Sequence, residues 1–387
     1  MANTGNLSDV ISLGVSIGQV ETASAKFDTV AILIVNNTWG AAQSNGRTNR
    51  YSDTATVSAD ANLTSTEKGV INACITDLNN LRGGKDVLVC ALLTADSSSV
   101  STAMDAVRTL DDEWHAVGGA ALSDAQLQSL AAWVETSDSN QDGGKVCVVS
   151  HEASGVGSAA YVSGSANISA AVKTNLYERT AVGWDPAATW ANGLMAAYFL
   201  GRYYSFDFNQ KAPPGVFLKN TGGRGTFTTT QQTNAMTYTG TFVAGNIHGA
   251  GGTTAGQFHP LFVGQGSAWE TIVAADYLWE MATTDLAVAV TRAASRGDRA
   301  FAHSDKGFAA AAAVVNGAID KCQRIGWVLP DVQPDEAGEN GKKSTCTYTK
   351  YADLSASDLS NLRIPLTVQI YTGPSARYIT GTIYADQ

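Results

Sequence analysis

The sequence predicts a mixed α/β protein with a strand near each terminus that has no obvious partner close by in the chain. Short apolar runs alternate with helical patterns between residues 27 and 150, which is typical of a mostly parallel sheet covered by helices. Two long helices are predicted in the second half of the chain. Apolar and polar residues alternate near both termini, as they do in half-buried strands.

Continuous apolar runs predict buried strands at residues 27–35, 86–93 and 145–150, because a strand covered on both faces needs apolar side chains on both. Helical spacing of apolar residues predicts helices at 63–81, 98–114 and 124–134. Ser65 or Thr66 is expected to cap the first of these helices.

The elements after residue 150 are less regular. Residues 184–204 predict a long apolar helix with Pro186 near its start, where proline is tolerated. Short β segments and a glycine-rich domain boundary are then predicted at 226–230, 238–243 and 248–256. Two further helices are predicted at 269–294 and 306–325, the second capped by Ser304 or Asp305, and a strand is predicted at 364–370.

The two terminal strands are predicted from strict alternation. At the start of the chain, the apolar face is formed by Ile11, Leu13, Val15 and Ile17. At the end of the chain, one face is formed by Ile379, Gly381 and Ile383, and the other by Tyr378, Thr380 and Thr382. Terminal residues are usually disordered unless something ties them down, so both strands are expected to join a sheet elsewhere.

Composition limits the possible functions. The 387 residues include 25 basic and 35 acidic ones, for a net charge of −10, which repels DNA and anionic lipid. With no basic stripe apparent, nucleic-acid binding is not expected. Five scattered cysteines without paired spacing predict buried thiols in a reducing compartment. The chain start does not resemble a signal peptide, and no apolar segment is long enough for direct membrane insertion.

Few motifs could carry chemistry. Residues 155–160 fit a GxGxxG/A loop, but a dinucleotide fold places this loop after its first strand. Glycine makes up 38 of the 387 residues, so chance matches to such a motif are expected. Residues 138–143 resemble the start of a calcium loop that lacks its closing glutamate. The pairs His151–Glu152 and His248–His259 lack the further groups that acid–base or metal sites need. No catalytic, cofactor-binding or metal-binding residue is therefore predicted.

Short motifs in a fixed order run through the last third of the chain. These are Ala255–Phe258, a helix with Asp276, Tyr277 and Leu278, a helix start at Ser304–Phe308, a helix end at Arg324–Gly326, and Arg363–Pro365 before the terminal strands. In this order they resemble the tail sheath proteins of contractile-tailed bacteriophages and related contractile injection systems. The resemblance covers about residues 255–387 and the N-terminal strand, whereas the middle matches only in its α/β character.

The resemblance implies a two-domain, sheath-like architecture with extended terminal strands that join neighbouring subunits. Residues 1–24 would form an N-terminal arm of the inner domain, and residues 255–387 would form the rest of that domain, ending in a C-terminal arm at about 374–387. Residues 25–254 would form an outer α/β domain. Inter-subunit strand exchange would involve Ile11, Leu13, Val15, Ile17, Tyr378, Ile379, Thr380, Thr382 and Ile383.

The implied function is structural, with no enzymatic activity and no cofactor. Such a subunit polymerises helically around a tail tube and contracts to drive the tube through the host envelope, which leads to genome ejection. The implied partners are further copies of the chain in stacked six-subunit rings, the tail tube protein, and baseplate and tail terminator proteins. The implied location is the tail sheath of the virion, after assembly in the host cytoplasm. The alternatives are another tail or baseplate structural protein, or an α/β enzyme with a glycine-rich phosphate-binding loop.

Overall fold

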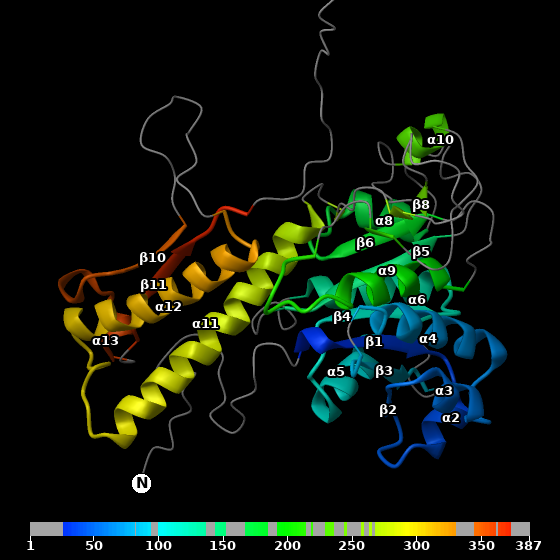
Figure 1. Cartoon of the computed structure of the whole chain (residues 1–387), viewed down its shortest axis with the longest axis horizontal. Helices are drawn as coiled ribbons and strands as arrows, with labels where there is room; N and C mark the ends of the chain where they lie inside the picture. Colours follow the sequence, from blue (N-terminus) through cyan, green and yellow to red (C-terminus); the bar gives the residue numbers. More distant parts are fainter. Residues whose placement is uncertain are drawn as a thin grey trace, which may run out of the picture.

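A computed structural model describes residues 26–81, 83–93, 100–136, 144–151, 167–184, 192–213, 218–219, 229–235, 244–245, 257–258, 263–264, 268–329, 344–360 and 363–372. In this part of the chain, a six-stranded sheet with helices on both faces lies beside two long helices and a two-stranded sheet (Figure 1). The predicted α/β class is confirmed. Both predicted terminal strands, around residues 11–17 and 378–383, lie outside the described residues.

The main sheet has the strand order β2-β3-β1-β4-β5-β6. Its parallel strands are β1 (Thr29–Ile34), β3 (Asp86–Ala91), β4 (Ala116–Ala120), β5 (Val146–His151) and β6 (Thr180–Trp184). The short edge strand β2 (Thr48–Tyr51) runs antiparallel to β3. The parallel strands are almost completely buried, which explains why three of them read as continuous apolar runs.

Helices cover both faces of this sheet. One face carries α4 (Ser65–Leu78) and α9 (Leu194–Tyr204), and the other carries α5 (Val100–Leu110), α6 (Asp124–Glu135) and α8 (Ile168–Thr174). The short helices α2 (Asn37–Ala42) and α3 (Thr54–Ala59) lie near the β2 edge (Figure 1). Helices α4 and α9 approach closely at Gly201, which has no side chain to keep them apart. A Cβ there would lie only 2.4 Å from the Cys74 carbonyl oxygen.

The second layer is formed by α11 (Trp269–Ser295), α12 (Asp305–Ile325), β10 (Thr345–Tyr348) and β11 (Leu366–Gln369). Helix α11 crosses between the main sheet and the rest of this layer (Figure 1). Ser304 caps the start of α12 as predicted, and Gly326, whose φ of 92° suits glycine, caps its end after Ile325. The remaining short elements are η1 (Lys26–Asp28), β7 (Leu218–Lys219), α10 (Thr229–Asn234), β8 (Ala244–Gly245), β9 (Gln257–Phe258), η4 (Tyr351–Asp353) and α13 (Ala356–Ser360).

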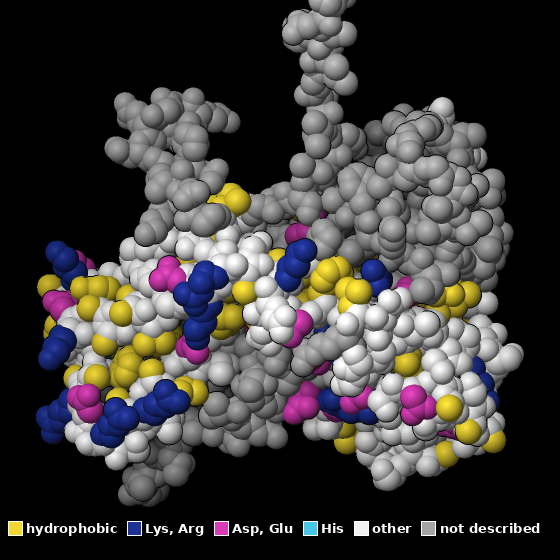
Figure 2. Space-filling model, in the orientation of Figure 1, with side chains coloured by type: hydrophobic (Ala, Val, Ile, Leu, Met, Phe, Trp, Pro, Cys, Tyr) yellow, Lys and Arg dark blue, Asp and Glu magenta, His cyan; other side chains and the backbone are white. Residues whose placement is uncertain are grey.

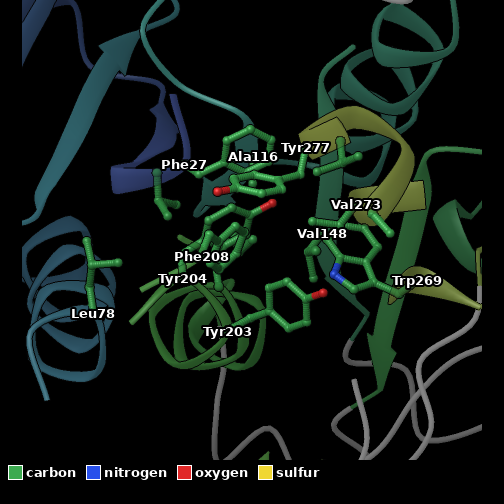
Figure 3. Packing of buried hydrophobic residues seen from close by; sticks show 14 of the residues in the cluster. Phe27, Leu78, Ala116, Val148, Tyr203, Tyr204, Phe208, Trp269, Val273 and Tyr277 are labelled. Carbon is green, nitrogen blue, oxygen red and sulfur yellow. The ribbon is translucent and has the colours of Figure 1, made fainter. Parts of the chain in front are cut away.

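One hydrophobic core joins the two layers. The main sheet and the helices that cover it are called the sheet unit below. Aromatic side chains from this unit and the segments next to it, including Phe27, Tyr204 and Phe208, pack against Trp269 and Tyr277 of α11 (Figure 3). Phe27 and Tyr277 meet edge to face with their ring centroids 5.2 Å apart, a favourable geometry for aromatic pairs. The core therefore runs across the predicted boundary between residues 254 and 255.

Some sequence predictions were wrong in detail. Thr64, rather than Ser65 or Thr66, caps α4, and it forms a capping box with Glu67. The helix predicted from residue 184 begins only at Leu194, because Trp184 ends strand β6. Residues 229–230, predicted as β, belong to helix α10. The predicted β segment at 238–243 and the boundary at 248–256 lie outside the described residues.

Strands β2, β4 and β6 were not predicted. Two of them have the sequences AVGGA and TAVGW, in which glycine and alanine together make up six of the ten residues and lack the preference of β-branched residues for strands. Glycine in β4 lets α9 approach the sheet, since a Cβ at Gly118 would lie 2.9 Å from a methyl group of Leu200. Packing of α9 on the sheet, rather than local preference, therefore favours β4.

The five cysteines are all buried and free, as predicted. Burial raises the pKa of every one of these thiols above its ordinary value, and a protonated, inaccessible thiol reacts slowly. We expect the native protein to show almost no reaction with a coloured thiol reagent such as DTNB, and the protein in urea to show five reactive thiols. Rapid labelling of even one cysteine in the native protein would contradict this packing.

Candidate functional site

An ionisable residue directly precedes each of the five parallel strands, so a row of such groups lies along the amino edge of the sheet. In the spatial order β3, β1, β4, β5 and β6, these residues are Lys85, Asp28, His115, Lys145 and Arg179. The lysines and the histidine are buried, which is costly for polar groups unless partners satisfy them. The partners of this row show how the two layers are held together.

Asp276 of α11 connects the second layer to this row. Its carboxylate accepts hydrogen bonds of 2.8 and 2.9 Å from the two terminal nitrogens of the Arg179 guanidinium, and one of 2.8 Å from His115 Nε2. The Asp276 side chain is only 4% exposed. A bidentate arginine–carboxylate pair is charge-assisted and demands a fixed geometry. Asp276 therefore fixes α11 relative to the starts of β4 and β6.

The protonation of this cluster follows from its contacts. Burial would raise the pKa of Asp276, but the charge of Arg179 and the hydrogen bonds from His115 and Arg179 hold that pKa below its ordinary value. Burial lowers the pKa of His115, despite the opposing effect of Asp276. His115 is therefore neutral near pH 7, with its Nε2–H donated to Asp276. Its Nδ1 accepts the Tyr204 hydroxyl at 2.5 Å.

These pKa shifts predict a pH dependence of stability. Unfolded His115 gains a proton below about pH 6.5, whereas the folded protein resists protonation of this residue because its pKa is lowered. The unfolded state then binds more protons, so stability should fall as the pH drops from 7.5 to 5.5. We expect the urea midpoint to fall over this range, and to fall less in His115→Gln. His151, whose pKa burial also lowers, would supply the remaining dependence, and equal slopes in both proteins would contradict the assignment to His115.

The two buried lysines form their hydrogen bonds and ion pairs with other residues of the sheet unit. Lys85 donates to the Tyr204 carbonyl at 2.5 Å and pairs with the carboxylate that precedes β1 at 3.0 Å. Lys145 pairs with the Asp112 carboxylate at 2.9 Å and lies 4.2 Å from the centroid of the Trp114 ring. Burial lowers the pKa of Lys145 to about 8. Both lysines have structural partners here and no described route to a substrate.

The carboxyl edge is where doubly wound sheets hold ligands, in the crevice at the point where the strand order reverses. In this sheet that point lies beside β1, which is flanked by β3 and β4. Next to it, the chain's own Gly193 lies against β4 so closely that a Cβ would be 2.0 Å from the Gly119 carbonyl oxygen. Ala121 N–H also donates to the Asn192 carbonyl at 3.0 Å. The chain itself therefore covers the end of β4.

His151, considered above as part of an acid–base pair, lies at the carboxyl end of β5. Its Nδ1 is 2.6 Å from the Ser169 hydroxyl, but Ser169 is completely buried and could not reach a substrate. The neighbouring Ser150 accepts the Ala196 N–H of α9 at 2.9 Å. These polar groups hold α8 and α9 against the sheet. Outside the described residues lie Glu152, the glycine-rich loop 155–160, the calcium-like loop 138–143, His248 and His259.

Exposed arginines gather at the far end of α11. Figure 2 shows Lys and Arg side chains over this end of the second layer, where Arg292, Arg296 and Arg299 are exposed. Cations near a helix carboxyl terminus are favourable, and the exposed Asp298 offsets part of their charge. This local gathering was not predicted from the sequence. It makes the surface at this end of α11 locally basic on a chain with a net charge of −10.

Among the described residues, no group of three or more histidine, cysteine or acidic side chains could hold a metal ion. None of the described helices combines the length with the apolar character that a membrane crossing requires.

Sequence comparison gives no relative: no protein-family model and no curated protein matches this chain. Comparison with solved structures does find the fold. A chain of the anti-feeding prophage baseplate matches with a TM-score of 0.63 and 12% identity, over 94% of both chains.

Contracted sheaths of two contractile injection systems also have this fold. The contracted helical sheath of the anti-feeding prophage matches with a TM-score of 0.60 and 12% identity, over 96% of this chain and 97% of that one. The PVC sheath complex of an extracellular contractile injection system, also contracted, matches with a TM-score of 0.59 and 14% identity over the same shares. The resemblance found in the sequence is thus confirmed at the level of the fold, over nearly the whole chain.

Proposed function

We propose that this protein is the sheath subunit of a contractile tail or contractile injection system. The observation that carries this proposal is the structural similarity to contracted sheath chains. It extends over 96% of this chain, both layers included, and over 97% of each sheath chain. The subunit would polymerise helically around a tail tube and contract to drive the tube forward. It would work outside the cell that made it, as part of a virion or an injection particle.

The architecture supports a structural role rather than an enzymatic one. Asp276 and the row of ionisable residues fasten the two layers together. At the carboxyl edge, Gly193 covers the end of β4 beside the usual ligand crevice. Neither place offers a described group that is both exposed and activated. A subunit with two firmly joined layers is suited to transmit force between neighbours.

The finer parts of the proposal rest on the sequence. Residues 1–24 and 255–387 would form the inner part of the sheath and residues 25–254 the outer part. Strand exchange through the arms at 11–17 and 378–383 would connect neighbours by β-strand addition. A repeated head-to-tail contact that does not close produces a helical filament. The other partners would be the tube protein and the baseplate and terminator proteins, with the rings containing six subunits.

Electron microscopy of the purified protein tests the proposal directly. We expect concentrated protein to form hollow helical tubes or stacked rings without any nucleotide, because polymerised sheaths need only subunit contacts. Coexpression with the matching tube protein should increase tube length. Uniform monomers at all concentrations, with and without the tube protein, would contradict the proposal.

The enzymatic alternative predicts a different result. If the glycine-rich loop at 155–160 bound a phosphate group, calorimetry with nucleotides would show stoichiometric binding that Gly155→Val abolishes. A sheath subunit should show no such heat, and Gly155→Val should still polymerise.

A further inference from the structure

The three residues of η1, directly before strand β1, each contact a different partner. The Lys26 ammonium lies 3.1 Å from a carboxylate oxygen of Glu280 on α11. The Asp28 carboxylate lies 3.0 Å from the ammonium of the buried Lys85. Between these two charged residues, the Phe27 side chain is only 1% exposed. One short element thus makes contacts to the main sheet and to the second layer.

Phe27 lies in the part of the core that joins the two layers. The centroid of its ring is 4.4 Å from that of His115, 5.3 Å from that of Phe208 and 5.2 Å from that of Tyr277. Tyr277 belongs to α11, whereas His115 directly precedes β4. Aromatic side chains contribute strongly to the stability of protein cores. Withdrawing Phe27 would therefore break contacts to both layers at once.

The ion pair of Lys26 with Glu280 is a second attachment of α11, next to Asp276. The two carboxylates are four residues apart, which places them on the same face of the helix, about one turn from each other. The side chains of Lys26 and Glu280 are 21% and 15% exposed, so salt screens this pair less than a fully exposed one. Asp276 binds His115 and Arg179 at the starts of β4 and β6, whereas Glu280 binds the residues that lead into β1.

A pull on the N-terminal arm reaches these contacts before it reaches the sheet. The proposed arm, residues 1–24, ends just before η1. Behind η1, strand β1 is paired with β3 on one side and with β4 on the other. Tension that enters the chain at Lys26 is first opposed by Glu280 and by the rings around Phe27. Only the remainder reaches the hydrogen bonds of β1.

We infer that η1 is a load-bearing anchor, which passes tension on the N-terminal arm to α11 through Lys26 and Phe27 and to the main sheet through Asp28. The inference rests on the proposed function, in which the arm joins a neighbouring subunit, and it assigns a role to residues beside the arm. An arm fastened to β1 alone would load only the sheet unit, and the contacts of Asp276 would then carry all the force that reaches the second layer. The anchor divides that force between two attachments.

Pulling single full-length molecules in optical tweezers tests the inference. Handles are attached through two introduced cysteines, either Ser24→Cys with Ala313→Cys or Ser129→Cys with Ala313→Cys. Residues 129 and 313 are exposed, on α6 and α12, and the five native cysteines are buried. The first pair pulls the arm against the second layer, and the second pair pulls the sheet unit against it. We expect Lys26→Ala to lower the rupture force mainly for the first pair, and Asp276→Asn to lower it mainly for the second.

Three variants distinguish the anchor from a general loss of stability. Glu280→Ala removes the other half of the ion pair and should reproduce the effect of Lys26→Ala. Lys26→Arg keeps the positive charge and should restore the rupture force of the first pair. Asp285→Ala removes the more exposed ion pair with Lys321, on the same helix, and should leave that force unchanged.

The outcomes separate this inference from the proposed function, because a single tethered molecule needs no assembly. Equal losses for both pairs in Lys26→Ala, or no loss for either, would overturn the anchor even if the protein forms normal tubes. A loss in Asp285→Ala as large as that in Glu280→Ala would also overturn it. If the rupture forces change as expected but the purified protein never forms tubes, the anchor is supported and the sheath assignment is wrong.

Discussion

Replacing Asp276 by alanine is expected to destabilise the folded protein by about 3–5 kcal/mol, the range for removing one partner of a buried ion pair. The substitution leaves the Arg179 guanidinium largely buried without its carboxylate and removes the acceptor of the His115 Nε2–H. Urea unfolding followed by circular dichroism measures the effect. Asp276→Asn should be less damaging than alanine, because the amide oxygen can still accept one hydrogen bond.

A matched control lies on the same helix. Asp285 forms an ion pair with Lys321 of α12 at 2.6 Å, but both side chains are partly exposed, at 30% and 46%. Partly exposed pairs contribute roughly 0–1 kcal/mol, so Asp285→Ala should have a small effect. If the two alanine variants lose similar stability, the buried cluster is not what holds the layers together.

Deleting residues 1–20 is expected to abolish polymerisation while leaving the subunit folded. The described fold, from Lys26 onward, has a hydrophobic core of its own that includes Phe27, so we expect it to fold without the arm. The deletion would remove the arm that is proposed to join a neighbouring subunit by β-strand addition. We expect no tubes by electron microscopy, together with a melting temperature close to that of the full chain.

A shorter deletion provides the control. Removing residues 1–8 leaves the apolar face of Ile11 to Ile17 intact and should allow tubes to form. If the deletion of residues 1–20 still gives tubes of normal length, the N-terminal arm does not connect the subunits. If that deletion instead unfolds the protein, the arm belongs to the subunit's own core.

The elements found correctly from the sequence are those with strong local signals. The apolar runs at β1, β3 and β5 and the long helices α11 and α12 combine length with apolar character. Strands β4 and β6 were missed, because their glycines carry no strand preference, and Gly118 of β4 is needed for the close packing of α9 on the sheet. Long-range packing of this kind leaves little trace in a single sequence.

The candidate site was only partly visible in the sequence. Asp276 and Tyr277 were noticed because they resemble a sheath motif, without any structural role attached to them. Their partners His115 and Arg179 are 161 and 97 residues away in the chain, too far for pattern reasoning to connect. One signal was present, however: each buried apolar strand begins just after an ionisable residue.

The length of α11 has a mechanical consequence. Its 27 residues span about 40 Å at roughly 1.5 Å per residue. Its first half is clamped to the sheet unit through Asp276, whereas its last turns extend to the exposed arginines. A helix held in this way acts as a lever: the part from Asp276 to Ser295 spans about 29 Å, so a tilt of about 10° at Asp276 would move the last turn by about 5 Å. Small rotations of the main sheet and its helices would thus become displacements of several ångströms at the arginine-bearing end of α11.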